Sequence, residues 1–262
     1  MGNTLEQPIA QGRTAEIYAW GEGRVLKLFR AGYARSACQH EFSIAQAVHH
    51  SGVPAPAVLA QTQLEGRHGI IYERLDGRTM LSALTEQPER LLEMAHKMAD
   101  LHRQIHQCTA IGLPRWHDKF NQALSQAKLS DVQKSAIAQR AAALPEADKV
   151  CHGDFHPDNI VITPAGLRAV DWNNAFSGHP LADIAWTSLV FQAGEAPQGS
   201  DPQLTAMKMA RATFLEAYLQ RRLDTNLTAL EAWLLPTAVL RLTDNIVEER
   251  EALLRVIDNA LG

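Results

Sequence analysis

The hydrophobic pattern of this 262-residue chain changes near residues 74–78. Before that point, short alternating stretches typical of strands surround one stretch with apolar residues at helical spacing. After it, apolar residues recur mostly at helical spacing over long stretches. We predict strands within residues 16–29, 57–63 and 69–73 and a helix over 34–50, then helices over 89–106, 118–143, 181–192, 203–222 and 228–259. This order predicts an α+β fold of two lobes. Residues 1–75 form a small lobe with an antiparallel sheet and one helix, and residues 76–262 form a larger, mainly helical lobe.

The composition excludes several classes of protein. With 46% hydrophobic and 21% charged residues, the chain has the balance of a globular protein rather than of a disordered or fibrous one. Its formal net charge of -4 does not suit broad binding to nucleic acids. Cys38, Cys108 and Cys151 are odd in number and form no CxxC pair, which argues against a disulfide framework or a structural zinc site. Residues 1–12 lack the pattern of a secretory signal, and no apolar run is long enough to cross a bilayer. We therefore expect a cytoplasmic protein without nucleic-acid or membrane partners.

One stretch of the C-terminal half breaks the helical pattern. Short strands are expected over residues 149–152, 160–163 and 167–170. A hairpin made of the last two would return the chain, so Asp171 should end beside Asn159. A phosphoryl-transfer site needs a carboxylate near the incoming hydroxyl and oxygen ligands for Mg²⁺. Carboxylates and a carboxamide occur here in that order, and Asn159 and Asp171 are candidate metal ligands.

His152, Asp154 and Asn159 follow the pattern HxDxxxxN, and after the hairpin come Asp171 and Trp172. In these residues the sequence resembles the aminoglycoside phosphotransferase and choline kinase-like family, relatives of protein kinases that phosphorylate small-molecule hydroxyls. The resemblance implies a bilobal, protein-kinase-like fold. It implies transfer of the terminal phosphoryl group of ATP, with Mg²⁺, to a hydroxyl of a small molecule. Asp154 would be the catalytic carboxylate that orients or deprotonates this acceptor, while Asn159 and Asp171 would hold Mg²⁺ against the nucleotide phosphates.

The resemblance extends into the N-terminal half of the chain. Lys27, in a predicted strand, is similar to the phosphate-binding lysine of the family, and Glu41, in the following helix, is similar to the glutamate that pairs with it. Residues 70–77 are similar to the strand and hinge of the family, where backbone groups near Glu73 and Leu75 would bind adenine. The first lobe would then bind the nucleotide, and the second would carry catalysis and acceptor binding.

Other residues distinguish this chain from protein kinases. The loop over residues 11–16 contains one glycine rather than the GxGxxG pattern, and Gly153 stands where protein kinases have the arginine of the HRD triplet. Only eight residues separate Asp171 from Pro180, which leaves no room for a long activation loop. These differences favour a small-molecule kinase over a protein kinase. Asp183 is similar to the family's aspartate that braces the catalytic loop.

Two other kinds of function stay open at this point. One is a catalytically idle module that binds a nucleotide in the same cleft. The other is a metallohydrolase, because His152, Asp154 and His156 alternate and would lie on one side of a strand. Gly153 and Pro157 argue against a strand there, however. His102 and His106 also have a zinc-like spacing on a helix, but no companion ligand accompanies them, so we interpret both as structural.

The acceptor itself is not identified by the sequence. Asp244, Glu248, Glu251 and Asp258 form an acidic stripe along the last predicted helix, with Arg255 between them. This stripe could receive a cationic acceptor such as an aminosugar or choline. It could equally be the solvated face of an amphipathic helix. Aminoglycosides, choline-like alcohols, sugars and amino-acid hydroxyls all remain possible acceptors, and GTP is not excluded as an alternative to ATP.

Overall fold

The N-terminal part of the computed structural model, which describes residues 7–193, 202–223 and 227–262, is a five-stranded antiparallel sheet. Its strand order is β1-β2-β3-β5-β4. The strands are β1 (Ala10–Gln11), β2 (Ala15–Ala19), β3 (Arg24–Phe29), β4 (Val58–Leu64) and β5 (Arg67–Glu73). The β2–β3 turn places Gly21 and Gly23 at φ 66 and φ 65, a conformation that glycine adopts readily.

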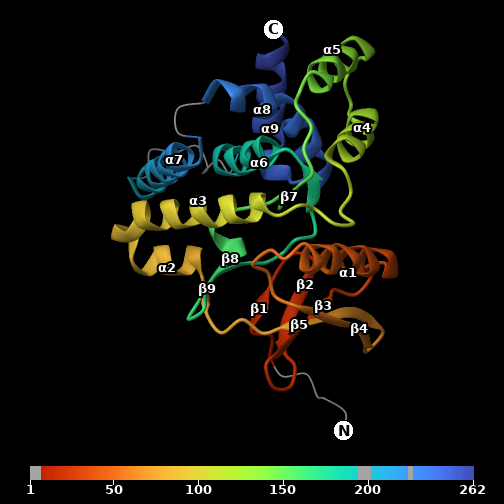
Figure 1. The fold of residues 1–262 in the computed structure, drawn as a ribbon, viewed down its shortest axis with the longest axis vertical. Coiled ribbons are helices and arrows are strands. Elements are labelled where there is room, and N and C mark those ends of the chain that lie inside the picture. Colours follow the sequence, from red (N-terminus) through yellow and green to blue (C-terminus); the bar gives the residue numbers. More distant parts are fainter. Residues whose placement is uncertain (1–6, 194–201, 224–226) are drawn as a thin grey trace.

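Helix α1 (Arg35–His50) lies between this sheet and the helical part of the molecule (Figure 1). Near its start, Cys38 is buried against Phe29 and Ile70 of the sheet. Near its end, Ile44 and Val48 join the large apolar cluster of the helical part. Because α1 packs against both parts, a side chain on it is held at the junction between them.

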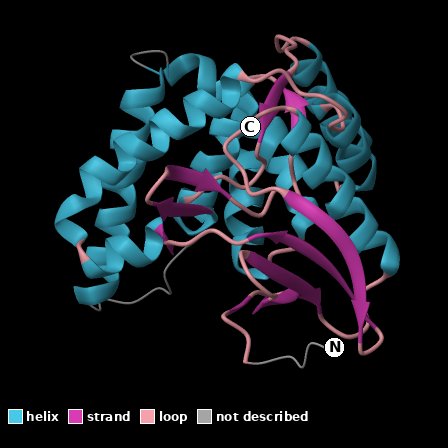
Figure 2. Ribbon diagram, turned by 60° about the horizontal axis from the view of Figure 1, so that its bottom comes forward, coloured by secondary structure: helices cyan, strands magenta, loops and turns pink. Residues whose placement is uncertain are grey.

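The second part is mainly helical, as the change of pattern predicts. Figure 2 shows the helices gathered to one side of the five-stranded sheet, which gives the predicted two-lobed α+β fold. The helices are α2 (Met80–Glu86), α3 (Leu91–Gln107), α4 (Trp116–Gln126), α5 (Asp131–Ala142), α6 (Pro180–Ala193), α7 (Pro202–Leu223), α8 (Leu227–Arg241) and α9 (Val247–Leu261).

Short strands cross the helical lobe near the junction. Strands β8 (Ile160–Thr163) and β9 (Gly166–Ala169) form the expected hairpin, and β6 (Arg78–Thr79) pairs with β8. Strand β7 (Lys149–Cys151) pairs with β10 (Phe176–Gly178). The pattern did not predict β6 and β10, which are too short to show alternation. The passage from the five-stranded sheet to the helical lobe falls between Glu73 and Arg78.

The single helix predicted over residues 118–143 is wrong, because the chain forms α4 and α5 there. The backbone is extended at Ala127 (ψ 136), and Ser130 begins α5 with a capping box shared with Gln133. In a capping box each side chain bonds the backbone of the other residue, which favours a helix start at that point. The Ser-x-x-Gln motif is present in the sequence and could have located this break.

The single helix predicted over residues 228–259 is also wrong. Helix α8 ends at Arg241, a short 3-10 turn η3 (Leu242–Asp244) follows, and α9 begins at Val247. Asn245, between them, has the left-handed conformation with φ 52. Asparagine tolerates this conformation better than most residues and often ends helices. Helical spacing continues on both sides of the turn, so periodicity alone does not reveal it.

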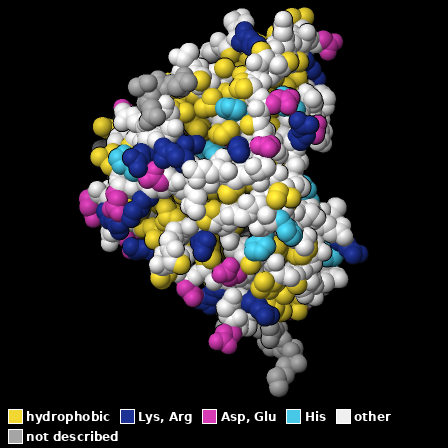
Figure 3. All heavy atoms as spheres, in the orientation of Figure 1, with side chains coloured by type: hydrophobic (Ala, Val, Ile, Leu, Met, Phe, Trp, Pro, Cys, Tyr) yellow, Lys and Arg dark blue, Asp and Glu magenta, His cyan; other side chains and the backbone are white. Residues whose placement is uncertain are grey.

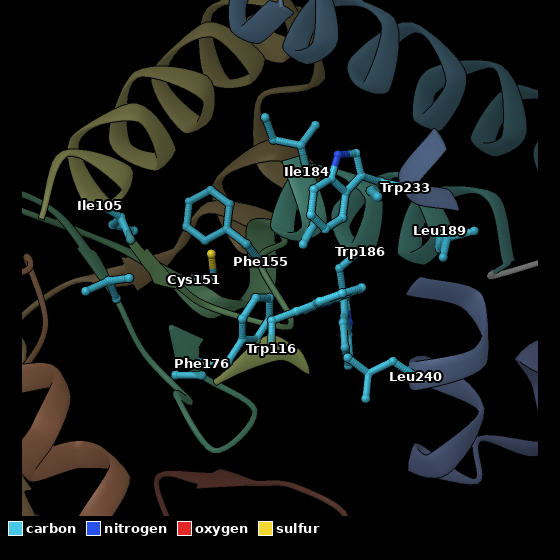
Figure 4. Packing of buried hydrophobic residues seen from close by; sticks show 14 of the residues in the cluster. Ile105, Trp116, Cys151, Phe155, Phe176, Ile184, Trp186, Leu189, Trp233 and Leu240 are labelled. Carbon is cyan, nitrogen blue, oxygen red and sulfur yellow. The ribbon is translucent and has the colours of Figure 1, made fainter. Parts of the chain in front are cut away.

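The largest buried side chains of the helical lobe surround the loop that follows β7 (Figure 4). Trp116, Trp186 and Trp233 come from α4, α6 and α8, and the rings of Trp116 and Trp233 meet edge to face with centroids 5.1 Å apart. Phe155, in the loop itself, and Phe176 of β10 are fully buried in the same cluster. The loop is thus anchored in the core by its own side chain.

The surface carries charges of both signs. On the face shown in Figure 3, basic and acidic side chains are interspersed. None of the helices in the described ranges is both long and apolar enough to cross a membrane. Residues 1–6, the start of the segment in which we found no secretory signal, lie outside the described residues.

Candidate active site

Lys27 of β3 forms ion pairs with one carboxylate from each lobe. Its Nζ lies 2.8 Å from Oε1 of Glu41 in α1 and 3.0 Å from Oδ1 of Asp171, which follows β9. Its neighbours Leu26 and Leu28 are buried on the other face of the sheet, because successive side chains of a strand alternate. Burial disfavours the charged ammonium group, but attraction by Asp171 and Glu41 raises the pKa of Lys27 above its ordinary value. The lysine is therefore a fixed cation at the junction of the lobes.

The hairpin brings Asp171 beside Asn159, as the sequence predicts. The backbone N–H of Val170 donates to the carbonyl of Asn159 over 2.9 Å. Asn159 ends a 3-10 turn, η2 (Pro157–Asn159), and its Nδ2 donates to the backbone carbonyl of Asp154 over 2.9 Å. The amide oxygen of Asn159 is then the atom that could bind a metal. Asp171 has φ 62, and its side chain is 51% exposed.

The carboxylate of Asp154 lies between His156 and Arg241. Its Oδ2 is 3.5 Å from Nε2 of His156, and its Oδ1 is 3.2 Å from Nη1 of Arg241. Burial favours the protonated form, but the hydrogen bond with His156 and the attraction of His156, Arg241 and His152 lower the pKa of Asp154 to about 2. Asp154 is therefore ionised at neutral pH, and it can accept a hydrogen bond from a hydroxyl group.

Asp183, in the first turn of α6, holds the backbone of this loop. Its Oδ2 accepts a hydrogen bond from the N–H of His152 over 2.6 Å, and its Oδ1 accepts one from the N–H of Gly153 over 2.9 Å. One turn later, Thr187 donates its hydroxyl to the carbonyl of Phe155 over 2.9 Å. Helix α6 thus fixes the backbone on both sides of Asp154.

Gly153 has a structural reason to replace the arginine of protein kinases. Its φ of 74 is a conformation that residues with a Cβ atom rarely adopt. A Cβ atom at this position would also lie 2.5 Å from the backbone oxygen of Asn174. The loop after β9 therefore packs directly against the backbone of residue 153, and no larger residue fits.

His102 and His106 of α3 lie against the same aspartate. Their Nε2 atoms are 2.9 Å and 3.1 Å from Oδ2 of Asp183, so the expectation that they have no companion is wrong. Among the residues that the structure describes, these three are the one group of three or more His, Cys, Asp or Glu side chains whose ligand atoms lie within reach of a common metal ion. However, Nδ1 of His102 is 2.5 Å from the hydroxyl of Tyr218, and Nδ1 of His106 is 2.7 Å from Nη2 of Arg222. Burial lowers the pKa of both histidines. The geometry is that of neutral imidazoles in a hydrogen-bond network, which agrees with a structural role.

The arrangement of His152, Asp154 and His156 does not support a metallohydrolase. The segment is no strand, because Gly153 turns the backbone and η2 follows. The ring of His152 is fully buried, and its Nε2 lies 3.0 Å from the carbonyl of Val170. Within the described ranges these three side chains do not converge as metal ligands would.

Glu73 and Leu75 lie where the sheet passes into the helical lobe. Glu73 is the last residue of β5, and its N–H donates to the carbonyl of Ala57 over 2.9 Å. Its carboxylate accepts a hydrogen bond from the N–H of Ala57 over 3.0 Å, so the side chain is held near the start of β4. Leu75 is half-buried in the segment before β6. Binding of adenine by the backbone here stays a prediction.

Sequence reasoning missed two cations of the site. Arg241, at the end of α8, has a 2% exposed side chain and contacts Asp154. Lys119 of α4 donates to the backbone carbonyl of Asn174 over 2.9 Å, and burial lowers the pKa of Lys119 to about 8. A signal existed for Arg241, because it directly follows the apolar run of α8, where a basic residue needs a buried partner.

The predicted acidic stripe is divided by the turn between α8 and α9. Asp244 lies in η3 with Oδ2 3.6 Å from Nη1 of Arg241, and burial raises the pKa of Asp244 to about 6. Glu248, Glu251 and Asp258 are exposed on α9, where Glu251 forms an ion pair within the helix. Only Asp244 of the stripe therefore lies close to Asp154 and its neighbours.

Comparison with known proteins shows which family has a sequence similar to that of this chain. The sequence model of the Phosphotransferase enzyme family matches residues 6–234. The Acyl-CoA dehydrogenase family member 11 of Rattus norvegicus is 26% identical over 179 residues, which are 58% of this chain and 23% of that protein. The chain thus spans about a quarter of that relative, 23% of its length. The Aminoglycoside 3'-phosphotransferase of Streptomyces fradiae is 24% identical over 200 residues, 68% of this chain and 70% of that protein.

Solved structures share the fold over nearly the whole chain. The apo form of a thermostable mutant of aminoglycoside phosphotransferase APH(4)-Ia has a TM-score of 0.66 at 17% identity and covers 99% of this chain and 96% of its own. A choline/ethanolamine kinase family protein from Mesorhizobium loti has a TM-score of 0.58 at 15% identity. The alignment covers 98% of this chain and 85% of the chain of that protein. Together with the match over residues 6–234, these likenesses confirm the resemblance seen in the sequence: the chain belongs to the phosphotransferase enzyme family and has its bilobal, protein-kinase-like fold.

Proposed function

We propose that this protein transfers the terminal phosphoryl group of ATP, with Mg²⁺, to a hydroxyl group of a small molecule. The observation that carries the proposal is the convergence of Lys27, Glu41 and Asp171 across the lobes, with contacts of 2.8 Å and 3.0 Å. The loop that carries Asp154 adjoins this cluster through Asn159. In phosphoryl transfer the protein does little covalent chemistry, and catalysis depends on positioning of the reactants and on electrostatic stabilisation. A fixed cation opposite carboxylates and a carboxamide serves those needs.

Each residue then has a role that follows from its contacts. Lys27 binds phosphate oxygens of the nucleotide, and Glu41 keeps the ammonium group in place when Asp171 releases it. Asp154 accepts a hydrogen bond from the acceptor hydroxyl and directs its oxygen toward the phosphorus. As the bond from phosphorus to the bridging oxygen loosens, the bond to the acceptor oxygen forms. The hydroxyl proton leaves late, because a carboxylate with a pKa of about 2 is a weak base, and Asp154 receives it.

Asn159 and Asp171 fit a magnesium ion. They offer a carboxamide oxygen and a partly exposed carboxylate, and Mg²⁺ prefers a few such oxygens together with water and phosphate. When bound there, Mg²⁺ would neutralise charge on the nucleotide phosphates. The backbone near Glu73 and Leu75 would bind the base, which makes residues 1–75 the nucleotide-binding lobe and residues 76–262 the catalytic and acceptor-binding lobe. ATP is the proposed donor, and GTP is the alternative to compare with it.

The acceptor we propose is a small hydroxylated molecule, favoured when it carries a positive charge. Asp244 supports this, because it is a carboxylate 3.6 Å from the arginine that contacts Asp154. Aminoglycosides, choline-like alcohols and sugars are the classes to test. A thermostable mutant of aminoglycoside phosphotransferase APH(4)-Ia, whose structure has a TM-score of 0.64 to this chain, forms a ternary complex with AMP-PNP and hygromycin B.

The test is a panel of hydroxylated amines, sugars and alcohols incubated with Mg²⁺ and ATP labelled in the terminal phosphate. We expect Asp154→Asn to lower kcat by at least about a hundredfold while nucleotide affinity stays within about twofold. Asp171→Asn should instead weaken the binding of nucleotide in the presence of Mg²⁺. Asp158→Asn, an exposed aspartate of the same loop, is the matched control and should keep both properties. Near-normal turnover in Asp154→Asn would contradict its role, and binding of ATP without labelling of any acceptor would indicate an idle nucleotide-binding module.

A further inference from the structure

Arg241, the last residue of α8, is a buried cation beside Asp154. Its side chain is 2% exposed, and Nη1 lies 3.2 Å from Oδ1 of Asp154. The two residues are 87 positions apart in the sequence. Arg241 also lies beyond residues 6–234, the part of the chain that matches the family, so membership of the family assigns it no role.

Glu249 of α9 holds the guanidinium group of Arg241 in one orientation. Nε of the arginine lies 2.6 Å from Oε2 of Glu249, and Nη2 lies 2.7 Å from Oε1. Two parallel hydrogen bonds of this kind fix the plane of the group. The guanidinium carbon is also 5.5 Å from the ring of Trp186. Nη1 is left to face Asp154, with Oδ2 of Asp244 3.6 Å away.

The two oxygens of the Asp154 carboxylate have different neighbours. Oδ1 faces Arg241, whereas Oδ2 lies 3.5 Å from Nε2 of His156 and 3.5 Å from Nδ2 of Asn159. The last torsion of an aspartate side chain is broad and turns easily unless contacts fix it. The short contact at Oδ1 is therefore the one that determines where Oδ2 points.

We propose that Arg241, held by Glu249, is a positioning residue that fixes the rotation of the Asp154 carboxylate for the acceptor hydroxyl. The inference rests on the proposed function, because it assumes that Asp154 orients the acceptor. A displacement of about 1 Å in such a group lowers the rate by about a hundredfold, so control of this rotation matters for turnover. Nucleotide binding, which uses Lys27 and Asp171, should depend little on it.

If the buried pair had only a structural role, a folded variant without it would keep the kcat of the wild type. Replacing a buried ion pair with apolar residues of similar size is often neutral or stabilising, whereas removing one partner leaves a buried charge unpaired. We therefore expect the double variant Arg241→Met, Glu249→Met to keep the fold, and it removes the contact to Asp154. The control is Arg90→Met, Glu93→Met, which removes a pair with the same bidentate geometry at an exposed place near the start of α3.

We expect the Arg241/Glu249 double variant to lower kcat by about 10-fold to 100-fold while its nucleotide KM stays within about twofold of that of the wild type. The Arg90/Glu93 control should change neither. Glu249→Gln, which keeps the shape of the side chain and loosens the hold on Arg241, should lower kcat several-fold. If the double variant does not fold, this single variant carries the kinetic test. Wild-type kcat in a folded double variant, or in Glu249→Gln, would overturn the inference.

A crystal structure of the double variant gives a readout that does not need turnover. The Asp154 carboxylate should leave the rotation seen beside Arg241 or spread over several rotations. If it keeps that rotation, the inference is wrong. If Glu249→Gln has to replace the double variant, the same comparison applies to it. A wild-type protein that labels no acceptor would contradict the proposed function instead, and the rotation of Asp154 would still decide the role of Arg241.

Discussion

Gly153 meets two separate requirements at the most sensitive point of the loop. It adopts φ 74, and it leaves space for the backbone of Asn174, whose oxygen would lie 2.5 Å from a Cβ atom. The sequence shows that a glycine stands where protein kinases have arginine. It does not show why, because the contact depends on a segment 21 positions further along the chain.

Gly153→Ala should therefore destabilise the protein more than the same change at a glycine that only needs a positive φ. Gly21 is the matched control, because its φ is 66 and a Cβ atom added there would have nothing within 4 Å. We expect Gly21→Ala to lower the free energy of unfolding by about 1 kcal/mol. Gly153→Ala should lower it by at least about 2 kcal/mol and also reduce turnover, since the clash moves the loop. Chemical denaturation of both variants measures the difference, and equal losses would contradict the close contact.

Asp244 should make stability depend on pH in a predictable direction. Burial raises the pKa of Asp244 to about 6, whereas an unfolded aspartate titrates near pH 4. The folded state therefore holds the proton more tightly, so this group stabilises the fold below about pH 4 and that stabilisation is lost as the pH rises through about 6. Between pH 4 and 7, the free energy of unfolding of the wild type should fall by on the order of 2 kcal/mol relative to that of Asp244→Asn.

The measurement is the free energy of unfolding of wild type and Asp244→Asn from pH 4 to pH 7. Glu248→Gln, an exposed residue of the same acidic stripe, is the control and should run parallel to the wild type. A constant difference between wild type and Asp244→Asn over this range would show that Asp244 does not titrate as its burial implies.

At the scale of elements, α6 connects the core with the loop that carries Asp154. Its residues are buried on most sides, and its first turn carries Asp183 with a fully buried side chain. The two histidines of α3 contact Oδ2 of the same carboxylate. Burial opposes ionisation of Asp183, but these histidines hold its pKa well below the ordinary value. A single carboxylate thus joins α3, α6 and the loop.

Asp183→Asn should both destabilise the protein and displace the loop that contains His152 and Gly153. An amide offers one acceptor oxygen where the carboxylate offers two, so one of the backbone N–H groups of His152 and Gly153 loses its partner. We expect the free energy of unfolding to fall by about 3 kcal/mol, which is typical when one partner of a buried charged network is removed. Asp100→Asn, an exposed aspartate on α3, should stay within about 1 kcal/mol of the wild type. Thermal unfolding of the two variants measures this, and similar stabilities would argue against the bracing role of Asp183.

Most elements were predictable because their periodicity is strong over a sufficient length. The strands over residues 24–29 and 160–163 lie where the pattern placed them, and α1 begins within one residue of the expected start. The two missed helix breaks have local causes, the capping box at Ser130 and the left-handed Asn245. Both occur inside continuous helical spacing, which reports the buried face of a segment and not the continuity of its backbone.

At the scale of the whole molecule, the two lobes meet through both polar and apolar contacts. Lys27 reaches Asp171 across the junction, and the N–H of Ala169 donates to the carbonyl of Pro54 over 2.9 Å. Helix α1 packs on both sides. A nucleotide bound to Lys27 and to the residues beside Asp171 would touch both lobes, so its binding energy should stabilise their association.

If Asp171 binds Mg²⁺, nucleotide should raise the unfolding temperature mainly when Mg²⁺ is present. At a concentration about a hundredfold above Kd, a ligand that binds only the folded state adds about 2.7 kcal/mol, or about 5 °C for a chain of this length. We expect AMP-PNP with Mg²⁺ to produce this rise in the wild-type protein and EDTA to remove most of it. Asp171→Asn should show a smaller rise than Asp158→Asn. An equal rise with EDTA would contradict metal binding at Asp171.

Short motifs were enough to predict the candidate site because a loop and a hairpin bring their residues together locally. Asp154, Asn159 and Asp171 lie within 18 positions of one another, and hairpin geometry is enough to join the last two. The contact between Arg241 and Asp154 spans 87 positions and depends on how α8 and α9 pack, which no local pattern determines. Contacts between residues so far apart in the sequence are seen only in the structure.

The ion pair between Lys27 and Asp171 also bears on the order in which the ligands arrive. In this structure the ammonium group contacts Oδ1 of the carboxylate that we propose as a metal ligand, so a divalent ion bound there without nucleotide would compete with Lys27 for that oxygen. Triphosphate oxygens would give Lys27 another anionic partner and would leave Asp171 available to the metal. Each ligand would then favour binding of the other, and magnesium should tighten the binding of nucleotide by the same factor by which nucleotide tightens the binding of magnesium.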